Sequence, residues 1–351
     1  MILHIFNDQK KFSKPFFGFL VEHSFDLKEH FLIHYGKKDE WFGISGINNF
    51  FIPSFISIIG NIRMLFYLFK ADKIIINCLA SPALILYLAV FPNLCKKSYW
   101  LIWGKDLYFF RFLEKIRWYH QVYEFFRKIV IRRIKYICTL FNNDYLLAKE
   151  WYNAEGELIP SILPFGLKPE LFRQIENDIT KDRYNIVIGN SASLTNNHED
   201  IFAIMKGKIS IDKIYCPLSY GGKKKYVNKI KDLGEKLFGN HFHPLIDFMD
   251  SADYFKFLDS VDIAIYNHHR QEAGNNIFSM ILMCKTVYLD LNTSVAKFLV
   301  EQRIVIKDIK ELENSNLEVL PRKILNNNAK ILRELYNEKN LIKTMKTIFN
   351  K

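Results

Sequence analysis

The residues best suited to bind a ligand lie in three short polar segments of the second half of the chain. They are residues 189–198, 217–222 and 267–276, and each follows an apolar run typical of a buried strand. In an open parallel sheet, the loops after the strands line one crevice at the carboxyl ends of those strands. The spacing therefore predicts one binding site built from all three segments.

The first polar segment has the composition of an anion-binding turn. Residues 186–188 predict a strand, Gly189 ends it, and a helical pattern begins at residue 199. A glycine allows close approach of a phosphate, and Asn190 and Ser191 can donate hydrogen bonds beside a helix N-terminus. The same residues also suit an ordinary turn with N-capping side chains, so this segment alone leaves both interpretations open.

The third polar segment contains a candidate diphosphate ligand. Arg270 could bind a diphosphate through two parallel hydrogen bonds, and Asn275 and Asn276 lie where the next helix starts. Alternatively, Arg270 pairs with a surface carboxylate and the asparagines only cap the helix. His268 and His269 are adjacent and would point apart in an extended chain, so we predict no metal site here.

Two aspartates are candidates for a general base. Asp106 follows the apolar run at residues 99–103, and Asp8 follows the first predicted strand at residues 3–6. A carboxylate at a strand end that faces a cleft can take up a proton during catalysis. Asp106 is equally suited to cap the helix that would follow it.

Signatures of several other enzyme classes are absent. The chain contains no Gly-x-Gly, no P-loop and no Gly-x-Ser-x-Gly elbow. No two aspartates lie two positions apart, so the Asp-x-Asp metal motif of many sugar transferases is also missing. We therefore predict no metal ion and no cofactor.

Strand-like and helix-like segments alternate along the chain, which predicts parallel α/β sheets. Residues 1–168 predict a first Rossmann-like domain, residues 180–320 a second, and residues 321–351 a C-terminal helical segment. Residues 166–183, with mixed charges, are typical of a linker between domains. In the first half, we also expect a possible strand at residues 44–47 and a helix at residues 53–70.

Residues 111–135 combine basic and aromatic side chains and predict one or two amphipathic helices. Such helices could lie on an anionic lipid surface, or they could present an ordinary solvated face. The lopsided charge and the aromatic enrichment favour the lipid surface. The side chains expected to contact the membrane are those of Arg111, Arg117, Arg127, Lys128, Arg132 and Arg133.

The composition indicates a globular protein with an anionic partner. The net charge is +12, and 31 Phe residues beside the excess of Lys and Arg favour a membrane surface over nucleic acid. The five scattered cysteines fit a reducing compartment rather than a disulfide framework. We expect no signal peptide, and the apolar run at residues 79–94 is shorter than the roughly 20 residues needed to span a membrane.

Four motifs, taken in order, resemble one known family. They are Ile-Trp-Gly-Lys-Asp-Leu-Tyr at residues 102–108, Gly-Asn-Ser followed by Asn-x-His at residues 189–198, Pro217 with Tyr220, and the pair Arg270-Gln271. Their order and spacing are similar to those of the bacterial TDP-Fuc4NAc:lipid II 4-acetamido-fucosyltransferase family, which makes enterobacterial common antigen. The resemblance covers most of the chain.

The resemblance implies a GT-B fold, in which two Rossmann-like domains face each other across a cleft and the second binds the nucleotide-sugar. It implies a polyprenyl-diphosphate-linked glycan as acceptor, a peripheral enzyme at the cytoplasmic face of the bacterial inner membrane, and catalysis without a metal ion. It places Asp106 at the cleft. The implied donor-binding residues are Gly189, Asn190, Ser191, Tyr220, Arg270 and Gln271.

The chain departs from the family's pattern around the expected donor site. Residues 192–193 are Ala-Ser instead of Gly-Asp, Ser219 replaces a glycine, and residues 272–276 replace Gln-Gly-Ile-Gly-Thr. A related O-antigen or capsule transferase therefore fits as well as the common-antigen enzyme.

These observations predict a metal-independent glycosyltransferase that moves a deoxy-amino sugar from a nucleoside diphosphate to an undecaprenyl-diphosphate-linked glycan. One alternative is a glycosyltransferase with a UDP-sugar donor. Another is a non-catalytic basic protein that binds membranes or polyanions. The basic residues lie beside aromatic ones without a recognised nucleic-acid module, so we do not expect nucleic acid as a partner.

Overall fold

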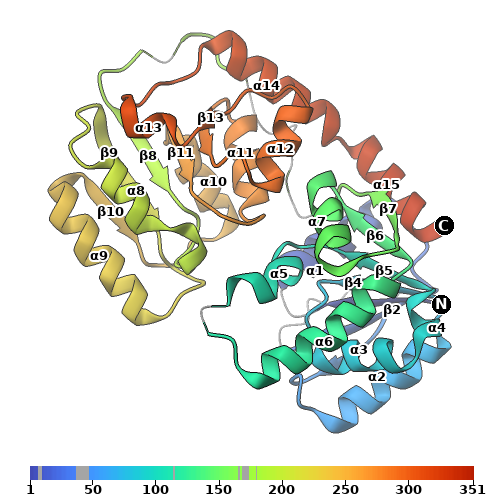
Figure 1. Ribbon diagram of the computed structural model, residues 1–351. Coiled ribbons are helices and arrows are strands. Elements are labelled where there is room, and N and C mark those ends of the chain that lie inside the picture. Colours follow the sequence, from blue (N-terminus) through green and yellow to red (C-terminus); the bar gives the residue numbers. More distant parts are fainter. Residues whose placement is uncertain (7–9, 37–46, 114, 165–166, 168–173, 179) are drawn as a thin grey trace. The chain divides into compact units, whose positions relative to one another are not determined.

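The chain forms two compact units (Figure 1). Unit 1 comprises Met1–Gly166 together with Glu338–Lys351, and unit 2 comprises Leu167–Asn337. The structure is a computed structural model that describes residues 1–6, 10–36, 47–113, 115–164, 167, 174–178 and 180–351. Each unit has its own parallel sheet with helices packed on it, so the prediction of two Rossmann-like α/β domains is confirmed.

The sheet of unit 1 has seven strands in the order β3-β2-β1-β4-β5-β6-β7, and every neighbouring pair is parallel. Its central strands are short apolar runs, as expected for strands buried on both faces. The strands are β1 (Ile2–Phe6), β2 (His30–Tyr35), β3 (Asn48–Ile52), β4 (Lys73–Asn77), β5 (Ser98–Leu101), β6 (Tyr136–Thr139) and β7 (Glu157–Pro160).

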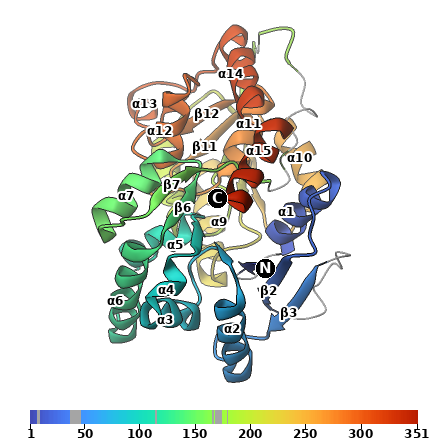
Figure 2. The same ribbon diagram turned by 90° about the vertical axis from the view of Figure 1, so that its right-hand side faces the viewer.

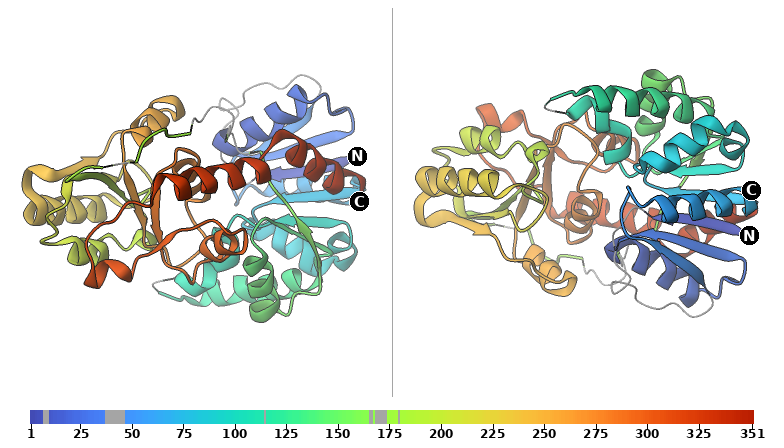
Figure 3. Two further views of the ribbon diagram at one scale, coloured as in Figure 1. Left: turned by 90° about the horizontal axis from the view of Figure 1, so that it is seen from above. Right: turned by 90° about the horizontal axis from the view of Figure 1, so that it is seen from below.

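Helices cover both faces of this sheet (Figure 3). On one face lie α1 (Lys10–Glu22) and α15 (Glu338–Asn350), whose apolar side chains share one core with the strands. The opposite face is covered by α2 (Ile58–Lys70), α3 (Pro82–Val90), α4 (Pro92–Cys95), α6 (Trp118–Arg133) and α7 (Asn142–Tyr152). The short helices α5 (Lys105–Tyr108) and η2 (Phe109–Phe112) follow β5.

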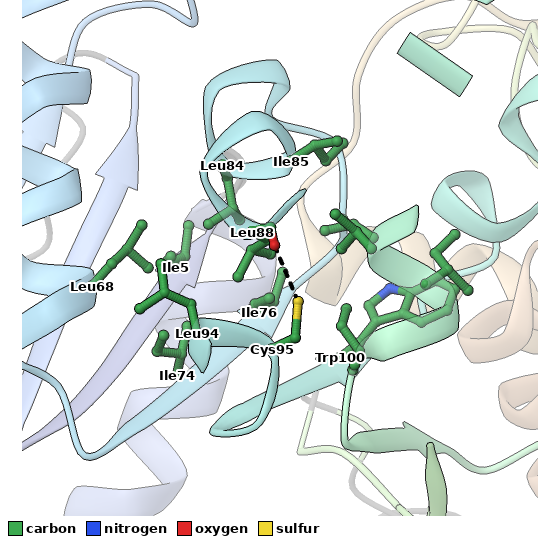
Figure 4. Packing of buried hydrophobic residues seen from close by; sticks show 14 of the residues in the cluster. Ile5, Leu68, Ile74, Ile76, Leu84, Ile85, Leu88, Leu94, Cys95 and Trp100 are labelled. Atoms are coloured by element: carbon green, nitrogen blue, oxygen red, sulfur yellow. Dashed lines mark hydrogen bonds between the residues drawn. The ribbon is translucent and has the colours of Figure 1, made fainter. Parts of the chain in front are cut away.

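Side-chain alternation along the strands supplies both cores of unit 1. Ile74 and Ile76 of β4 point to the face of α2 and α3, where they pack with Leu68 and Leu88 (Figure 4). Ile75, between them, belongs to the core on the opposite face. All of these side chains are fully buried, which accounts for the unbroken apolar run in the sequence.

The sheet of unit 2 has six strands in the order β10-β9-β8-β11-β12-β13. The strands are β8 (Tyr184–Ile188), β9 (Ile211–Pro217), β10 (Phe242–Leu245), β11 (Ile263–Tyr266), β12 (Thr286–Leu289) and β13 (Lys307–Asp308). The helices are α8 (His198–Met205), α9 (Lys224–Phe238), α10 (Ser251–Asp259), α11 (Gly274–Leu282), α12 (Ser294–Glu301), α13 (Glu311–Asn314) and α14 (Arg322–Leu335).

The strand order of unit 2 reverses next to β8. From β8 the chain runs outward to β9 and β10, then crosses back to β11 on the other side of β8. Such a reversal opens a crevice at the carboxyl ends of the two strands, because the following loops turn to opposite faces. The loops after β8 and β11 are two of the three polar segments that the sequence singles out.

Some predicted elements differ from the observed ones. The expected strand at residues 44–47 lies mostly outside the described residues, and the strand found nearby, β3, covers Asn48–Ile52. The helix expected at residues 53–70 starts only at Ile58, because the Ser57 hydroxyl caps it by accepting the Gly60 N–H at 3.3 Å. Helix α1 was not expected.

The expected C-terminal segment 321–351 is divided between the two units. Helix α14 contacts α11 in unit 2. Helix α15 packs in unit 1, where Met345 and Ile348 are buried and the Phe349 ring lies 4.8 Å from the ring of His30. The last helix therefore completes the first domain.

Candidate functional site

The three polar loops of unit 2 are joined by hydrogen bonds. The Ala192 N–H donates to the Tyr220 carbonyl at 2.7 Å, which links the loops after β8 and β9. The Thr195 hydroxyl donates to the Glu272 carboxylate at 2.6 Å, and Asn197 Nδ2 donates to the Asn267 carbonyl at 2.7 Å. These last two bonds link the loops after β8 and β11. The loops therefore form one surface at the carboxyl ends of the strands.

Gly189 is required by its surroundings. Its φ is +71°, and a Cβ there would lie 2.6 Å from Asn196 Oδ1 and 2.7 Å from His198 Nε2. The next N–H, of Asn190, donates to that same Asn196 oxygen at 2.8 Å. This turn is therefore folded around the Asn196 side chain.

The predicted residues Asn190 and Ser191 are largely buried and shape the loop. Asn190 Nδ2 donates to the Tyr220 hydroxyl at 3.3 Å, and the Ser191 hydroxyl accepts a bond from Asn196 Nδ2 at 3.2 Å. Asn190 Oδ1 is buried and has no hydrogen-bond partner among the described residues. The Gln271 side-chain oxygen, in the loop after β11, is in the same condition. Buried polar atoms normally have partners, so both oxygens could accept bonds from a ligand.

Two buried histidines lie beneath this surface. Burial lowers the pKa of both His198 and His268 to about 3, so each ring is neutral at pH 7. Because Asn196 Oδ1 can only accept, His268 Nε2 carries the proton in their 3.0 Å bond. His198 Nδ1 lies 3.0 Å from the Tyr226 hydroxyl. Sequence reasoning had weighed His268 only as a metal ligand, although its place at a buried strand end was a signal for this role.

Arg270 forms an ion pair within the site. Its Nη2 lies 2.8 Å from the Glu272 carboxylate and 3.5 Å from the Thr195 hydroxyl. The carboxylate alternative raised by the sequence is therefore observed, although the partner lies in the loop itself. The side chains of Arg270 and Glu272 are 12% and 15% exposed, so only a small part of each reaches solvent. Sequence reasoning missed Glu272 as a member of the site.

Helix α11 begins beside this ion pair. Its N-cap residue is Ala273, with a φ of +57°, and no side chain caps the helix. Asn275 and Asn276 lie in its first turn, and Asn276 Nδ2 donates to the Tyr254 hydroxyl at 3.2 Å. Neither asparagine is the N-cap residue. The N–H groups of this first turn are the kind that bind phosphates at helix N-termini.

The Asp106 carboxylate in unit 1 accepts hydrogen bonds from two backbone N–H groups and one side chain. Its carboxylate accepts the Leu79 N–H at 2.9 Å, the Trp100 indole N–H at 2.7 Å and the Trp103 N–H at 3.0 Å. The side chain is buried, and Gly104, not Asp106, is the N-cap residue of α5. A carboxylate occupied by three donors is poorly placed to take up a proton, so the contacts favour a structural role over the predicted general base. Asp8, the other candidate, lies outside the described residues.

The prediction that Arg127 contacts a membrane is wrong. Arg127 is fully buried, and its guanidinium lies 2.9 Å from Glu124 Oε2 and 3.2 Å from the Leu79 carbonyl. A buried arginine is retained only with such partners, because an unpaired buried charge is costly. The other five predicted membrane-contacting residues, Arg111, Arg117, Lys128, Arg132 and Arg133, are exposed.

Residues 81–330, well over half of the chain, match the model of the 4-alpha-L-fucosyltransferase family, glycosyltransferase group 56. The chain belongs to this family. It is therefore a glycosyltransferase, as the sequence predicted. No curated protein matches the sequence.

Solved structures show the same fold. HepE of Anabaena in complex with UDP-glucose is similar over 100% of both chains, with a TM-score of 0.68 and 12% identity. WaaG, a glycosyltransferase involved in lipopolysaccharide biosynthesis, has a TM-score of 0.63 and 13% identity over 100% of both chains. The apo form of OtsA has a TM-score of 0.64 and 9% identity, and covers 100% of this chain and 98% of its own. The predicted GT-B fold of the transferase is confirmed.

In the described part of the transferase, neither a group of metal-ligating side chains nor a membrane-spanning helix is present. No three His, Cys, Asp or Glu side chains there are grouped as a metal site would require. Within the same residues, every helix is too short or too polar to cross a membrane.

Gly189→Ala should destabilise unit 2 more than Gly207→Ala does. Both glycines have a positive φ, but a Cβ at Gly207 has nothing within 4 Å. The difference therefore isolates the collision with Asn196 and His198, which we expect to cost about 1–3 kcal/mol. Urea denaturation of both variants measures it. Equal losses would show that the loop yields to the added methyl group.

Asp106→Asn should lower the stability of unit 1 by about 2 kcal/mol or more, because an amide cannot accept all three hydrogen bonds. Glu150→Gln, which removes an exposed carboxylate of the same unit, is the control and should change little. Denaturant titration measures both. A variant as stable as the control that has lost turnover would instead restore Asp106 as the base.

Acidification should destabilise unit 2. In the unfolded chain a histidine titrates near 6.5, whereas His198 and His268 titrate at about 3 when folded. Between these values the unfolded chain binds more protons, so stability is complete above pH 6.5 and falls as the pH drops. His268→Gln, which can still donate to Asn196, should show a smaller loss of urea midpoint between pH 7 and pH 5. If the urea midpoint of His268→Gln fell as much as that of the wild type, buried His268 would not be a source of the pH dependence.

Proposed function

We propose that the protein is a metal-independent transferase that moves a deoxy-amino sugar from a dTDP-linked donor to a polyprenyl-diphosphate-linked glycan. The observation that carries this proposal is the position of Arg270 beside the uncapped first turn of α11. A departing nucleoside diphosphate develops negative charge as the glycosidic bond breaks. A guanidinium and helix N–H groups can stabilise that charge together.

Glu272 holds Arg270 ready for the donor. One carboxylate holds the Arg270 guanidinium in place, and the side chain remains partly exposed to solvent. When the donor enters, the diphosphate replaces Glu272 as the partner of the guanidinium, and the carboxylate turns away. The oxygens of Asn190 and Gln271, which have no partner among the described residues, accept hydrogen bonds from the sugar or the ribose. Tyr220, joined to Asn190, borders the same surface.

The acceptor in this proposal is lipid-linked, as the family resemblance implies, and the enzyme works as a peripheral protein on the cytoplasmic face of the inner membrane. The exposed basic side chains of α6 support this placement, because they suit a surface of anionic phospholipids.

A UDP-sugar is the second candidate donor. It is favoured by the likeness to HepE, a solved complex with UDP-glucose. The site residues described above contact phosphate and sugar in this proposal rather than the base, so they serve either nucleotide.

Arg270→Ala should weaken binding of dTDP or UDP by roughly ten- to a hundredfold, because a charge-assisted hydrogen bond is lost. Arg183→Ala is the control, since this exposed arginine precedes β8 at the opposite end of the strand. Thymidine and uridine should bind all variants equally. Calorimetry in the presence of EDTA measures the affinities, and mass spectrometry of lipid-linked products identifies the transferred sugar.

Variants of Glu272 test whether Arg270 binds the diphosphate itself or only neutralises the negative charge of Glu272, which would otherwise repel the ligand. Glu272→Gln should bind the diphosphate more tightly, because the competing carboxylate is gone. The double variant Arg270→Ala, Glu272→Gln should remain weak. Full recovery in the double variant would mean that the unpaired Glu272 had repelled the ligand, and Arg270 would not be the phosphate ligand. A strict requirement for Mg²⁺ or Mn²⁺ would contradict the metal-free mechanism.

A further inference from the structure

Helix α2 is apolar on both of its faces. One face packs on the sheet of unit 1 through Met64 and Leu68. The opposite face carries a stripe of exposed apolar side chains that starts with the adjacent pair Ile58 and Ile59 and continues at a spacing of three or four residues with Ile62, Phe66 and Phe69. Ile59 is 83% and Phe66 63% exposed. A continuous apolar stripe of this kind marks an interaction surface rather than an ordinary solvated helix.

The exposed apolar surface continues from α2 onto α3. The two helices lie in contact on the same face of the sheet (Figure 2), and the Phe69 ring lies 5.1 Å from the ring of Phe91 at the end of α3. Leu86 and Val90 of α3 are also exposed, and α3 contains no charged residue. The apolar area therefore spans two adjacent helices.

The exposed charges carried by the helices of this area are cationic, although Asp72 follows α2 and Glu155 pairs with Arg132 of α6. Helix α2 contains Arg63 and Lys70 and no acidic residue. Along α6, which packs beside α3, the single acidic side chain is Glu124, which is buried against Arg127. The exposed charges of these helices are consequently cationic. An apolar face on helices whose exposed charges are cationic matches a layer of anionic phospholipid headgroups over hydrocarbon.

We propose that the α2–α3 face of unit 1 is the membrane-docking surface of the enzyme, with the α2 stripe inserted into the headgroup boundary of an anionic bilayer. The basic residues of α6 add electrostatic attraction at its border. Helix α2 has 13 residues, too few to span a bilayer, so it lies in the plane of the interface. A second copy docked on this helix would instead add its own Arg63 and Lys70 to the contact, with no acidic side chain of α2 to pair with them.

The location of the stripe suits a lipid-linked acceptor, and in this respect the proposal rests on the proposed function. Helices α2, α3 and α6 each begin on the side of the sheet where the parallel strands end, because each follows a strand. Ile58 and Ile59, two of the most exposed apolar residues of the stripe, are in the first turn of α2. The deepest insertion therefore lies at the end of the unit where an α/β sheet binds its ligands.

The test is sedimentation of the purified protein with vesicles of phosphatidylglycerol and phosphatidylethanolamine, without donor or acceptor. The wild type should bind these and should bind phosphatidylcholine vesicles weakly. The triple variant Ile59→Gln, Ile62→Gln, Phe66→Gln should bind roughly a hundredfold more weakly, since three apolar side chains no longer enter the interface. The matched control is Ile209→Gln, Phe248→Gln, which removes two exposed apolar side chains of unit 2 and should bind like the wild type.

Varying the salt concentration distinguishes electrostatic attraction to the vesicles from insertion of the apolar side chains. The variant Lys128→Glu, Arg132→Glu, Arg133→Glu should lose binding at low ionic strength, whereas high salt should weaken the wild type and leave the defect of the α2 variant in place. Wild type that does not sediment, or an α2 variant that sediments like the wild type, would overturn the proposal. So would an α2 variant that is monomeric where the wild type is a dimer without vesicles.

Failure of this proposal can be told apart from failure of the proposed function. Binding of dTDP or UDP is measured by calorimetry without any membrane and should be equal in the wild type and the α2 variant. Urea denaturation shows separately whether unit 1, which contains α2, is folded in the variant. Vesicle binding without nucleotide binding would leave the docking surface intact and overturn the donor assignment, and the reverse result would do the opposite.

Discussion

The candidate donor site depends on one buried amide. The Asn196 oxygen accepts the Asn190 N–H from its own loop and the His268 Nε2–H from the loop after β11, and its nitrogen donates to the Ser191 hydroxyl. These three bonds fix the two loops on either side of the point where the strand order reverses. Because this amide and the ring of His198 fill the space above residue 189, only a glycine fits there. A buried amide with partners for both its oxygen and its nitrogen holds such a surface in place before any ligand arrives.

Two arginines show how burial decides the role of a residue. Arg127 is enclosed in unit 1, with Glu124, main-chain carbonyls and the Tyr152 hydroxyl at 3.3 Å as its partners, and it stabilises the domain. Arg270 reaches the surface of unit 2 beside one carboxylate and a helix N-terminus. The buried guanidinium of Arg127 therefore has a structural role. In the proposed mechanism, the partly exposed Arg270 exchanges its carboxylate partner for an anionic ligand.

In the proposed enzyme, the two units divide the work of a transferase on a lipid-linked substrate. Unit 2 supplies polar loops and a helix N-terminus for a charged donor. Unit 1 exposes the apolar stripe of α2, with basic side chains nearby, which we propose to face a lipid surface. Both arrangements follow from parallel sheets, since every connecting helix begins at the edge where the strands end. In the proposed enzyme, the donor and the lipid-linked acceptor approach such edges of their own domains.

The sequence by itself determined the sheet architecture and the identity of the three loops. Apolar runs such as residues 74–76 and 186–188 are long enough only for buried strands, and polar residues after them mark the loops at the strand ends. Membership of a fucosyltransferase family also followed from the sequence, because the order of motifs can be recognised without knowledge of contacts. Local patterns of this kind need no partner from elsewhere in the chain.

Only the tertiary structure decided which of these residues are buried and what they contact. Arg127 and Lys128 are neighbours in a basic segment, yet one lies in the core and the other in solvent, because a helix turns each side chain by about 100° from the last. The three donors around the Asp106 carboxylate, which favour a structural role over that of a base, come from the folded structure. Glu272 and Asn196 gained their roles from residues more than 70 positions away. Partners so distant in sequence leave no local pattern, so folding alone brings them together.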